Sequence, residues 1–196
     1  MIKKLLRPSI VMTLVLCVLT GLVYPGIVTA VAQAVFPRQA NGSLVKVNGR
    51  VVGSELIGQS FTQPWYFRSR PSPAGSGYDA AASSGSNKGP TDAKLADTLI
   101  NARIDTAILA DHVRRGEIPG DMVTASASGL DPDITPANAY LQVARVAGSR
   151  NADSTAVRAL VTKHIKGRQF GFFGEPRVNV LMLNIALDSV FPRKAQ

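Results

Sequence analysis

The sequence is poor in the residues that carry most enzyme chemistry, with one cysteine and two histidines among 196 residues. Cys17 cannot form an internal disulfide, so the fold must be stabilised by its own core or by a partner. The sequence also lacks the HExxH and CxxC patterns of metal sites and the Gly-x-Ser-x-Gly pattern of serine hydrolases. These absences disfavour a metallohydrolase or serine hydrolase of a familiar type, and we expect no metal site.

Charge is missing from a long segment near the N-terminus. After Lys3, Lys4 and Arg7, no charged residue follows until Arg38. A helix that crosses a bilayer needs roughly 20 mainly apolar residues. A soluble helix of such length normally shows a polar face, and this segment has none. We therefore predict a transmembrane helix over residues 9–36.

The three early cations predict the orientation of this helix, because positively charged flanks remain in the cytoplasm. Residues 1–8 are then a basic cytoplasmic tail, and residues 37–196 lie outside the cytoplasm. A cleaved signal peptide is the alternative, since small residues at Ala30, Ala32 and Ala34 resemble a cleavage site. The apolar segment exceeds the usual ~7–15 residues of a signal peptide, which favours retention of the helix.

The part after the helix is long enough for one domain with its own core. Residues 44–47 and 51–52 have the composition of short strands, and Asn48-Gly49 between them is a strong hairpin signal. Phe61 and Trp65–Phe67 are predicted as further strand residues. The beginning of the domain is therefore expected to be β-rich.

Gly, Ser, Ala and Pro dominate residues 70–90, which predicts a long irregular loop. Residues 91–115 follow with a helical pattern and Thr91 as N-cap. Two more helices are predicted, one starting at Thr135-Pro136 and one at Ser154.

Residues 178–187 are apolar apart from two asparagines, which predicts a central buried strand that could turn into a short C-terminal helix. The expected fold class is a single N-terminal transmembrane helix plus one mixed α/β (α+β) extracytoplasmic domain.

The chain is basic, with 22 Lys and Arg against 13 Asp and Glu. The cations are scattered, and no run of them alternates with aromatic residues as single-stranded nucleic acid would require. A basic surface that meets acidic lipid headgroups or an acidic partner is more consistent with this pattern. We therefore predict contact with the lipid bilayer and no nucleic-acid partner.

Two loops could carry chemistry. Ser84-Gly85-Ser86-Asn87 is a weak candidate for cradling phosphate through backbone N–H groups. It is no Walker A loop, because Lys88 is followed by Gly89 instead of Ser or Thr.

The segment that starts at Asp131 begins like a calcium loop, but Pro136 stands at its sixth position, where the turn needs Gly. For the preceding hydroxyl-rich residues 124–129, ordinary turn and cap chemistry and a partner-docking or ion-guiding role both remain open.

Taken together, several motifs resemble the C subunit of the Kdp potassium-transporting P-type ATPase of bacteria, over essentially the whole chain. The matching residues are 20–25 (TGLVYP), 57–61 (IGQSF), 66–72 (YFRSRPS), 84–87 (SGSN), 89–91 (GPT), 123–131 (VTASASGLD), 174–181 (GEPRVNVL) and 183–184 (LN).

The resemblance implies an assembly in the bacterial inner membrane. Its other members are a channel-like potassium-selecting subunit, a P-type subunit that hydrolyses ATP and a small fourth membrane subunit. The C subunit is implied to be a non-catalytic companion, described as a catalytic chaperone that raises the ATP affinity of the hydrolysing subunit. ATP then enters only through the complex, and no cofactor is expected to bind this chain firmly.

The predicted orientation conflicts with direct contact between the Ser84–Asn87 loop and cytosolic ATP, because that loop would lie outside the cytoplasm. The family pattern also often has a second Gly where this chain has Ser86. A hypothesis consistent with the orientation is that the exported domain covers the outer mouth of the ion-selecting subunit.

The alternative function is a membrane-anchored extracytoplasmic enzyme or solute-binding protein. It requires His112, Asp131 and Asp133 to converge in one pocket. For the accessory role, no catalytic residue is predicted, and the candidates for partner contact come from the matching motifs. They are Tyr66, Arg70, Asn87, Ser126, Asp131, Glu175 and Arg177.

Overall fold

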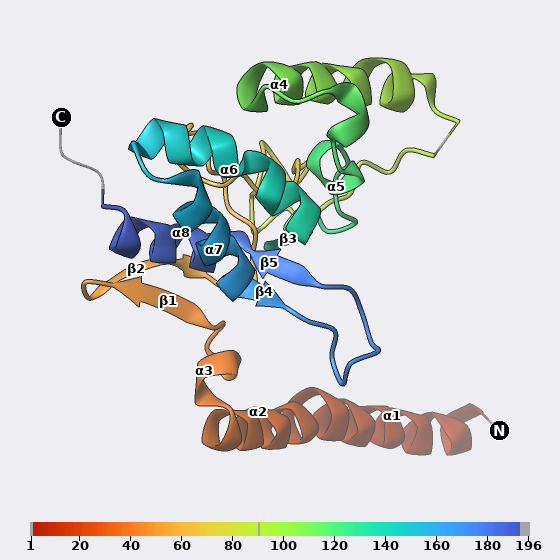
Figure 1. Cartoon of the computed structure of the whole chain (residues 1–196). Coiled ribbons are helices and arrows are strands. Elements are labelled where there is room, and N and C mark those ends of the chain that lie inside the picture. The colour runs from red at the N-terminus through yellow and green to blue at the C-terminus, as the bar shows by residue number, and fades with distance from the viewer. Residues whose placement is uncertain (1, 90, 193–196) are drawn as a thin grey trace. The chain divides into compact units, whose positions relative to one another are not determined.

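The computed structural model describes residues 2–89 and 91–192. The chain forms two compact units, residues 1–54 and residues 55–196 (Figure 1).

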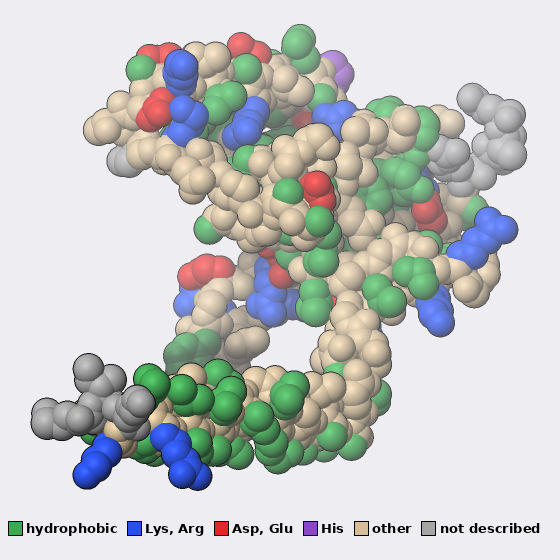
Figure 2. Space-filling view, turned by 180° about the vertical axis from the view of Figure 1, so that it is seen from behind, with side chains coloured by type: hydrophobic (Ala, Val, Ile, Leu, Met, Phe, Trp, Pro, Cys, Tyr) green, Lys and Arg blue, Asp and Glu red, His purple; other side chains and the backbone are tan. Residues whose placement is uncertain are grey.

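The first unit begins with a long apolar helix. Its parts are α1 (Ile2–Val18), a π-helical turn (Leu19–Val23) and α2 (Tyr24–Val35). Residues Lys4–Val35 are long and apolar enough to cross a membrane, none of their most apolar window is buried, and hydrophobic side chains coat the helix surface (Figure 2). The apolar helix predicted over residues 9–36 is therefore present.

The π-helical turn lies directly before Pro25. A proline inside a helix lacks a backbone N–H, and its ring crowds the carbonyl four residues earlier. The wider turn gives that ring room, and the Tyr24 N–H bonds to the Leu19 carbonyl five residues back. The helix thus continues through Pro25 without ending.

A short helix α3 (Pro37–Ala40) leads into the hairpin of β1 (Leu44–Val47) and β2 (Arg50–Ser54). The strands pair antiparallel. Asn48 and Gly49 both adopt positive φ, 50° and 78°, as the favoured two-residue hairpin turn requires. The predicted hairpin is confirmed.

The second unit combines a small antiparallel sheet with helices (Figure 1). Its strand order is β3 (Asp133–Ile134), β5 (Arg177–Asn179), β4 (Ile165–Lys166). Three helices pack against one another beside the sheet: α6 (Pro136–Arg150), α7 (Ser154–His164) and α8 (Val180–Val190). The buried core consists of Phe67, Ile134, Ala139, Val143, Val146, Ala147, Val157, Val161, Val178, Val180, Leu183 and Leu187.

Residues 178–187 were predicted as a strand that could turn into a short C-terminal helix; the change from strand to helix is confirmed, but the expected length of the strand is wrong. Only Arg177–Asn179 form a strand, and helix α8 starts at Val180. The Asn179 side chain accepts a hydrogen bond from the Met182 N–H and caps the helix. A short apolar run does not separate a buried strand from a buried helix, so the capping asparagine was the signal that the prediction missed.

The strand predicted at Phe61 and Trp65–Phe67 is also absent. Phe67 is fully buried, yet its backbone pairs with a side chain instead of a strand: Asn184 accepts from the Phe67 N–H and donates to its carbonyl, both at 2.9 Å. The Gln142 side chain bonds the Arg68 backbone in the same way: it accepts from the Arg68 N–H at 2.8 Å and donates to the Arg68 carbonyl at 3.2 Å. Helix side chains therefore replace a neighbouring strand here.

Two arginines of α6 complete this arrangement. Arg145 donates to the carbonyl of Tyr66 at 2.9 Å and pairs with Asp111 at 2.7 Å, and both charged side chains are almost entirely buried. Arg150 donates to the carbonyl of Trp65 at 2.8 Å. Burial lowers the pKa of Arg145, and the Asp111 carboxylate opposes that shift.

The remaining helices follow the prediction with shifted ends. Residues predicted as one helix, 91–115, form a π-helical segment (Lys94–Ile100), α4 (Asn101–Asp111) and a short 3-10 turn (Arg115–Glu117), before α5 (Gly120–Val123). The predicted cap Thr91 is wrong, because Asp92 accepts from the Leu95 N–H instead. Thr135 caps α6 as predicted, whereas Asp153, one residue before Ser154, caps α7.

A cleft lined by paired charges

A cleft of about 400 Å³ opens beside β3 and β5 in the second unit. Four of the seven predicted partner-contact residues line it: Arg70, Asp131, Glu175 and Arg177. They come from the irregular loop after Phe67, the segment before β3 and the segment that enters β5, so the fold gathers residues about 100 positions apart in the sequence. The full lining is Arg70, Asp121, Asp131, Asp133, Ile134, Thr135, Gln169, Phe173, Gly174, Glu175, Pro176 and Arg177.

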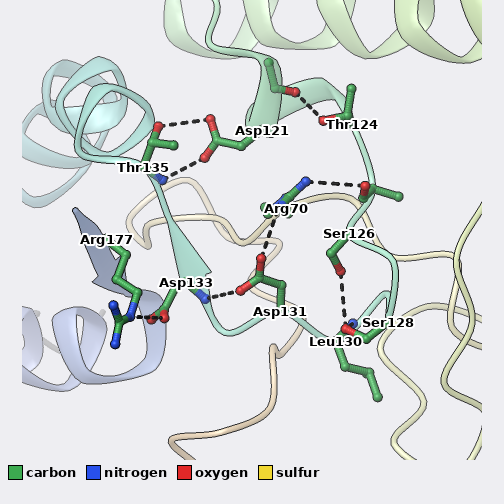
Figure 3. Close-up of polar contacts among 12 residues, drawn as sticks. Arg70, Asp121, Thr124, Ser126, Ser128, Leu130, Asp131, Asp133, Thr135 and Arg177 are labelled. Atoms are coloured by element: carbon green, nitrogen blue, oxygen red, sulfur yellow. Dashed lines mark hydrogen bonds and ion pairs between the residues drawn. The ribbon is translucent and has the colours of Figure 1, made fainter. Parts of the chain in front are cut away.

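One wall of the cleft is held by Arg70 (Figure 3). Its guanidinium pairs with the Asp131 carboxylate at 2.9 Å and donates to the Ala125 carbonyl at 3.3 Å. The other Asp131 oxygen accepts from the Asp133 N–H at 3.0 Å. Both side chains of the pair remain partly exposed, so Arg70 and Asp131 fix the loop while keeping charge at the cleft surface.

The opposite wall carries a second pair, Asp133 with Arg177 at 3.0 Å (Figure 3). The two residues lie on the neighbouring strands β3 and β5. Burial raises the pKa of Asp133, and the nearby Arg177 guanidinium opposes that rise. The Asp133 carboxyl is therefore the acid in this cleft that takes up a proton more readily than an ordinary aspartate.

Asp121 is a cleft residue that the sequence analysis missed. Its carboxylate accepts from the Thr135 N–H at 2.8 Å, from the Thr135 hydroxyl at 3.0 Å and from the Asn138 side chain at 3.0 Å. It thereby joins α5 to the beginning of α6 (Figure 3). A single aspartate in the first turn of a short helix carries no signal of this long-range role.

The Ser84–Asn87 loop packs against residues 126–129. The Ser84 N–H donates to the Ser128 carbonyl at 3.0 Å. Gly129 adopts φ +67°, and a Cβ there would lie 2.5 Å from the Ser84 carbonyl oxygen. Glycine is therefore required by close packing of the two loops. One N–H group of the suggested phosphate cradle is already used in this contact.

The other predicted residues lie apart from the cleft lining. The Tyr66 hydroxyl donates to Asp188 at 2.8 Å, and its ring lies under the Arg150 guanidinium. Ser126 approaches Ser128 at 3.4 Å in the neighbouring loop. Asn87 is exposed and adopts positive φ. Glu175, by contrast, lies at the cleft rim with 75% of its side chain exposed, paired with Arg168.

His112, Asp131 and Asp133, which the alternative of an enzyme or solute-binding protein required in one pocket, do not line a common one. His112 lines a separate cavity with Arg145 and Ala144, whereas Asp131 and Asp133 line the charged cleft. Among residues 2–89 and 91–192, no group of three or more His, Cys, Asp or Glu is placed to hold a metal ion.

Comparison with known proteins identifies the family. The family described as "K+-transporting ATPase, c chain" matches residues 6–189. Proteins named "Potassium-transporting ATPase KdpC subunit" are similar over nearly their whole length. The one from Gemmatimonas aurantiaca is 60% identical over 94% of this chain and 92% of its own length. The one from Koribacter versatilis is 53% identical over 97% of each chain, and the one from Burkholderia orbicola is 55% identical over 95% and 97%.

The chain therefore belongs to the family of potassium-transporting ATPase c chains, as the sequence motifs indicated. The match extends through the apolar helix and through the unit that carries the cleft.

Proposed function

We propose that this chain is the non-catalytic accessory subunit of an ATP-driven potassium uptake complex. The observation that carries the proposal is the family match over residues 6–189, which includes both the apolar helix and the cleft. The relatives are named as subunits of potassium-transporting ATPases. The partners are a channel-like potassium-selecting subunit, a P-type ATP-hydrolysing subunit and a small fourth membrane subunit.

The apolar helix anchors the chain by a single crossing of the bacterial inner membrane, with the N-terminus in the cytoplasm. The cations at its start support this orientation, because Lys and Arg are enriched on the cytoplasmic side. The second unit then lies outside the cytoplasm, over the outer mouth of the potassium-selecting subunit.

The charged cleft is the proposed contact with that subunit. Its exposed rim carries Glu175, which pairs with Arg168 outside the cleft lining, while the pairs deeper in the cleft keep the rim in a fixed geometry. Charged rims of this kind determine which partner binds and in what register more than how tightly it binds. Among the residues of the predicted contact set, Glu175 is the one whose charge a partner reaches most easily.

Any effect on ATP affinity is then indirect. The Ser84–Asn87 loop lies on the side away from cytosolic ATP. A Cβ at Gly85 would lie 2.8 Å from the Ala127 carbonyl oxygen, so close packing against residues 126–129 already accounts for the glycine of this loop. The subunit acts as a chaperone of the catalytic subunit by stabilising one arrangement of the membrane helices, a linkage between two sites that needs no direct contact with nucleotide.

The test of assembly is copurification in detergent of the tagged full chain from membranes of cells that produce the whole transport complex. We expect two larger membrane proteins to elute with it, and disruption of the apolar helix by Leu16→Arg to release them. Elution of the parent chain alone would contradict the proposal.

The test of orientation is chemical labelling in whole cells. In a Cys17→Ser background, Ser86→Cys lies in an exposed part of the loop and should react with a membrane-impermeant maleimide applied outside. A cysteine at Lys4 serves as the control and should react only after the cells are opened. Reaction of Ser86→Cys only in opened cells would contradict the orientation.

A further inference from the structure

The connection between β4 and β5 carries three exposed phenylalanines. Phe170, Phe172 and Phe173 are 87%, 64% and 57% exposed. The whole of residues 166–175 is exposed, and the connection extends away from the sheet of its own unit (Figure 1). Isolated exposed apolar residues are ordinary, but three large ones gathered at the end of a projection indicate a contact surface.

The projection is a hairpin closed by two backbone hydrogen bonds. The Gln169 N–H donates to the Phe173 carbonyl and the Phe173 N–H donates back to Gln169, both at 2.9 Å. The rings of Phe172 and Phe173 lie against each other with centroids 4.2 Å apart and planes tilted by 42°. The phenylalanines are therefore presented together in one geometry, which lowers the entropy cost of binding.

Phe170, at the apex of the hairpin, has a backbone conformation that glycine or asparagine would adopt with less strain. Phe170 adopts φ +53° and Gly171 φ +82°. Positive φ suits Gly or Asn in a tight hairpin, whereas for a bulky residue it is an outlier that costs free energy. An exposed phenyl ring at this position contributes no packing within the unit, so its benefit must come from something outside it.

Cations surround the base of the hairpin. Lys163 and Lys166 are exposed, and neither forms an ion pair within the described residues. Arg168 lies closer to the apex, where Glu175 is its partner. Lys166 also acts on the Asp133 carboxylate, where it opposes the rise of the pKa that burial causes. Apolar rings at the tip with exposed lysines behind them match the order of layers at a membrane surface, where acyl chains lie beneath anionic headgroups.

We propose that this hairpin, residues 166–175, inserts its phenylalanine tip into the interface of an anionic lipid bilayer. The chain carries its own apolar helix, so the second unit is tethered beside a bilayer and a weak lipid contact is made at high effective concentration. The contact gives this unit a second attachment to the membrane besides the helix. The proposed lipid contact can form on either side of the membrane, so it does not depend on the orientation of the apolar helix.

The test uses the full chain alone, in vesicles of phosphatidylcholine and phosphatidylglycerol. Phe172→Trp adds a reporter to the single native tryptophan, whose emission in the parent chain is the baseline. We expect the added emission to shift to the blue and to be quenched by lipids brominated on their acyl chains. Replacing Lys163 and Lys166 with Gln should reduce the quenching, and should do so only when phosphatidylglycerol is present.

Leu109→Trp is the matched control, because Leu109 is 76% exposed on α4, away from the hairpin. It should not be quenched. Phe170→Trp is a second reporter at the tip, and an unchanged thermal unfolding midpoint shows that each variant folds.

Three results would overturn the proposal. They are unquenched emission from both tip reporters, equal quenching of the Leu109 reporter, and a blue shift that appears only when the larger subunits are added. The last result would assign the tip to a protein pocket. None of these outcomes depends on whether the chain copurifies with partners, so the lipid contact and the accessory role fail separately.

Discussion

Two regions of the second unit are held together by different forces. Around β5, helices α6, α7 and α8 bury valines and leucines against one another. The irregular residues 56–89 and the loop that precedes β3 bury few large apolar side chains. The backbone of residues 65–68 is bonded by Asn184, Gln142 and two arginines, and the Ala125 carbonyl in the loop is bonded by Arg70. The first region depends on apolar area, and the second depends on individual hydrogen bonds.

The difference explains where the cleft lies. Apolar packing tolerates small rearrangements of hydrophobic side chains, whereas a bonded loop has one arrangement that satisfies its polar groups. The cleft residues Arg70 and Asp131 belong to the bonded region, and the strand residues Asp133 and Arg177 join it to the packed region. The cleft, which must present charges in fixed positions, thus lies mainly in the bonded region, where only one arrangement satisfies the polar groups.

The largest effect should come from the buried charge pair of Arg145 and Asp111, which supports the bonded region from α6 and α4. Arg145→Met removes the partner of the buried Asp111 and the donor to the Tyr66 carbonyl. Breaking one side of a buried ion pair typically costs about 3–5 kcal/mol. Urea unfolding of the detergent-solubilised chain, followed by the emission of Trp65 in the bonded region, measures it. The exposed pair provides the control: Arg114→Met should leave the unfolding free energy almost unchanged, because solvent screens that pair.

In the packed region, Leu183→Ala removes a fully buried side chain from the core. The expected loss of unfolding free energy is about 2–5 kcal/mol, from lost apolar burial and the cavity that remains. Leu109→Ala is the exposed control and should change little. Comparable losses for the two leucines in urea unfolding would show that the helical region is not the core described above.

A similar but more local effect is expected for Asn184→Leu, which keeps the size of the side chain and removes both bonds to the Phe67 backbone. Each buried group left unpaired costs about 1–3 kcal/mol. Native-state hydrogen exchange should locate the loss at residues 65–68, with less change in α7. Uniform loss of protection in both regions would contradict the division between them.

The smallest effect is a pH dependence at the junction of the two regions. The folded-state pKa of Asp133 is raised by burial, so the folded chain binds this proton at a higher pH than the unfolded chain. Stability from this group therefore increases as pH falls through the raised pKa toward the ordinary value. Asp133→Asn has no carboxyl to titrate at this position. Its unfolding free energy, measured by urea unfolding over a pH series, should therefore lack this increase at low pH. Identical slopes for parent and variant would show that the carboxyl is not perturbed.

Most of the packed region and the apolar N-terminal helix were predicted from the sequence better than the bonded region was. The long charge-free segment, Asn48-Gly49 and the Thr135 cap are local signals, and each was read correctly. The bonds that hold Trp65–Phe67 come from side chains about 80–120 residues further along the chain, so no local pattern announces them. Aromatic residues there resembled a strand because a strand is the usual way to satisfy a buried extended backbone.

The candidate cleft was predicted only as separate motifs. Arg70, Asp131, Glu175 and Arg177 were selected because their motifs resemble a family, and the fold brings them to one cleft. Asp121 carried no such signal, because its partners Thr135 and Asn138 become neighbours only through the packing of α5 on the start of α6.

The central claim is that the cleft rim joins this chain to its larger partners, and a matched pair of charge reversals tests it most directly. Glu175→Arg and Glu117→Arg each reverse an exposed glutamate that pairs with a nearby arginine, the first at the cleft rim and the second beyond α4. Both variants should keep the unfolding midpoint of the parent. In detergent copurification, we predict that Glu117→Arg retains both larger proteins and Glu175→Arg loses them. Retention of both partners by the two variants alike would contradict the account.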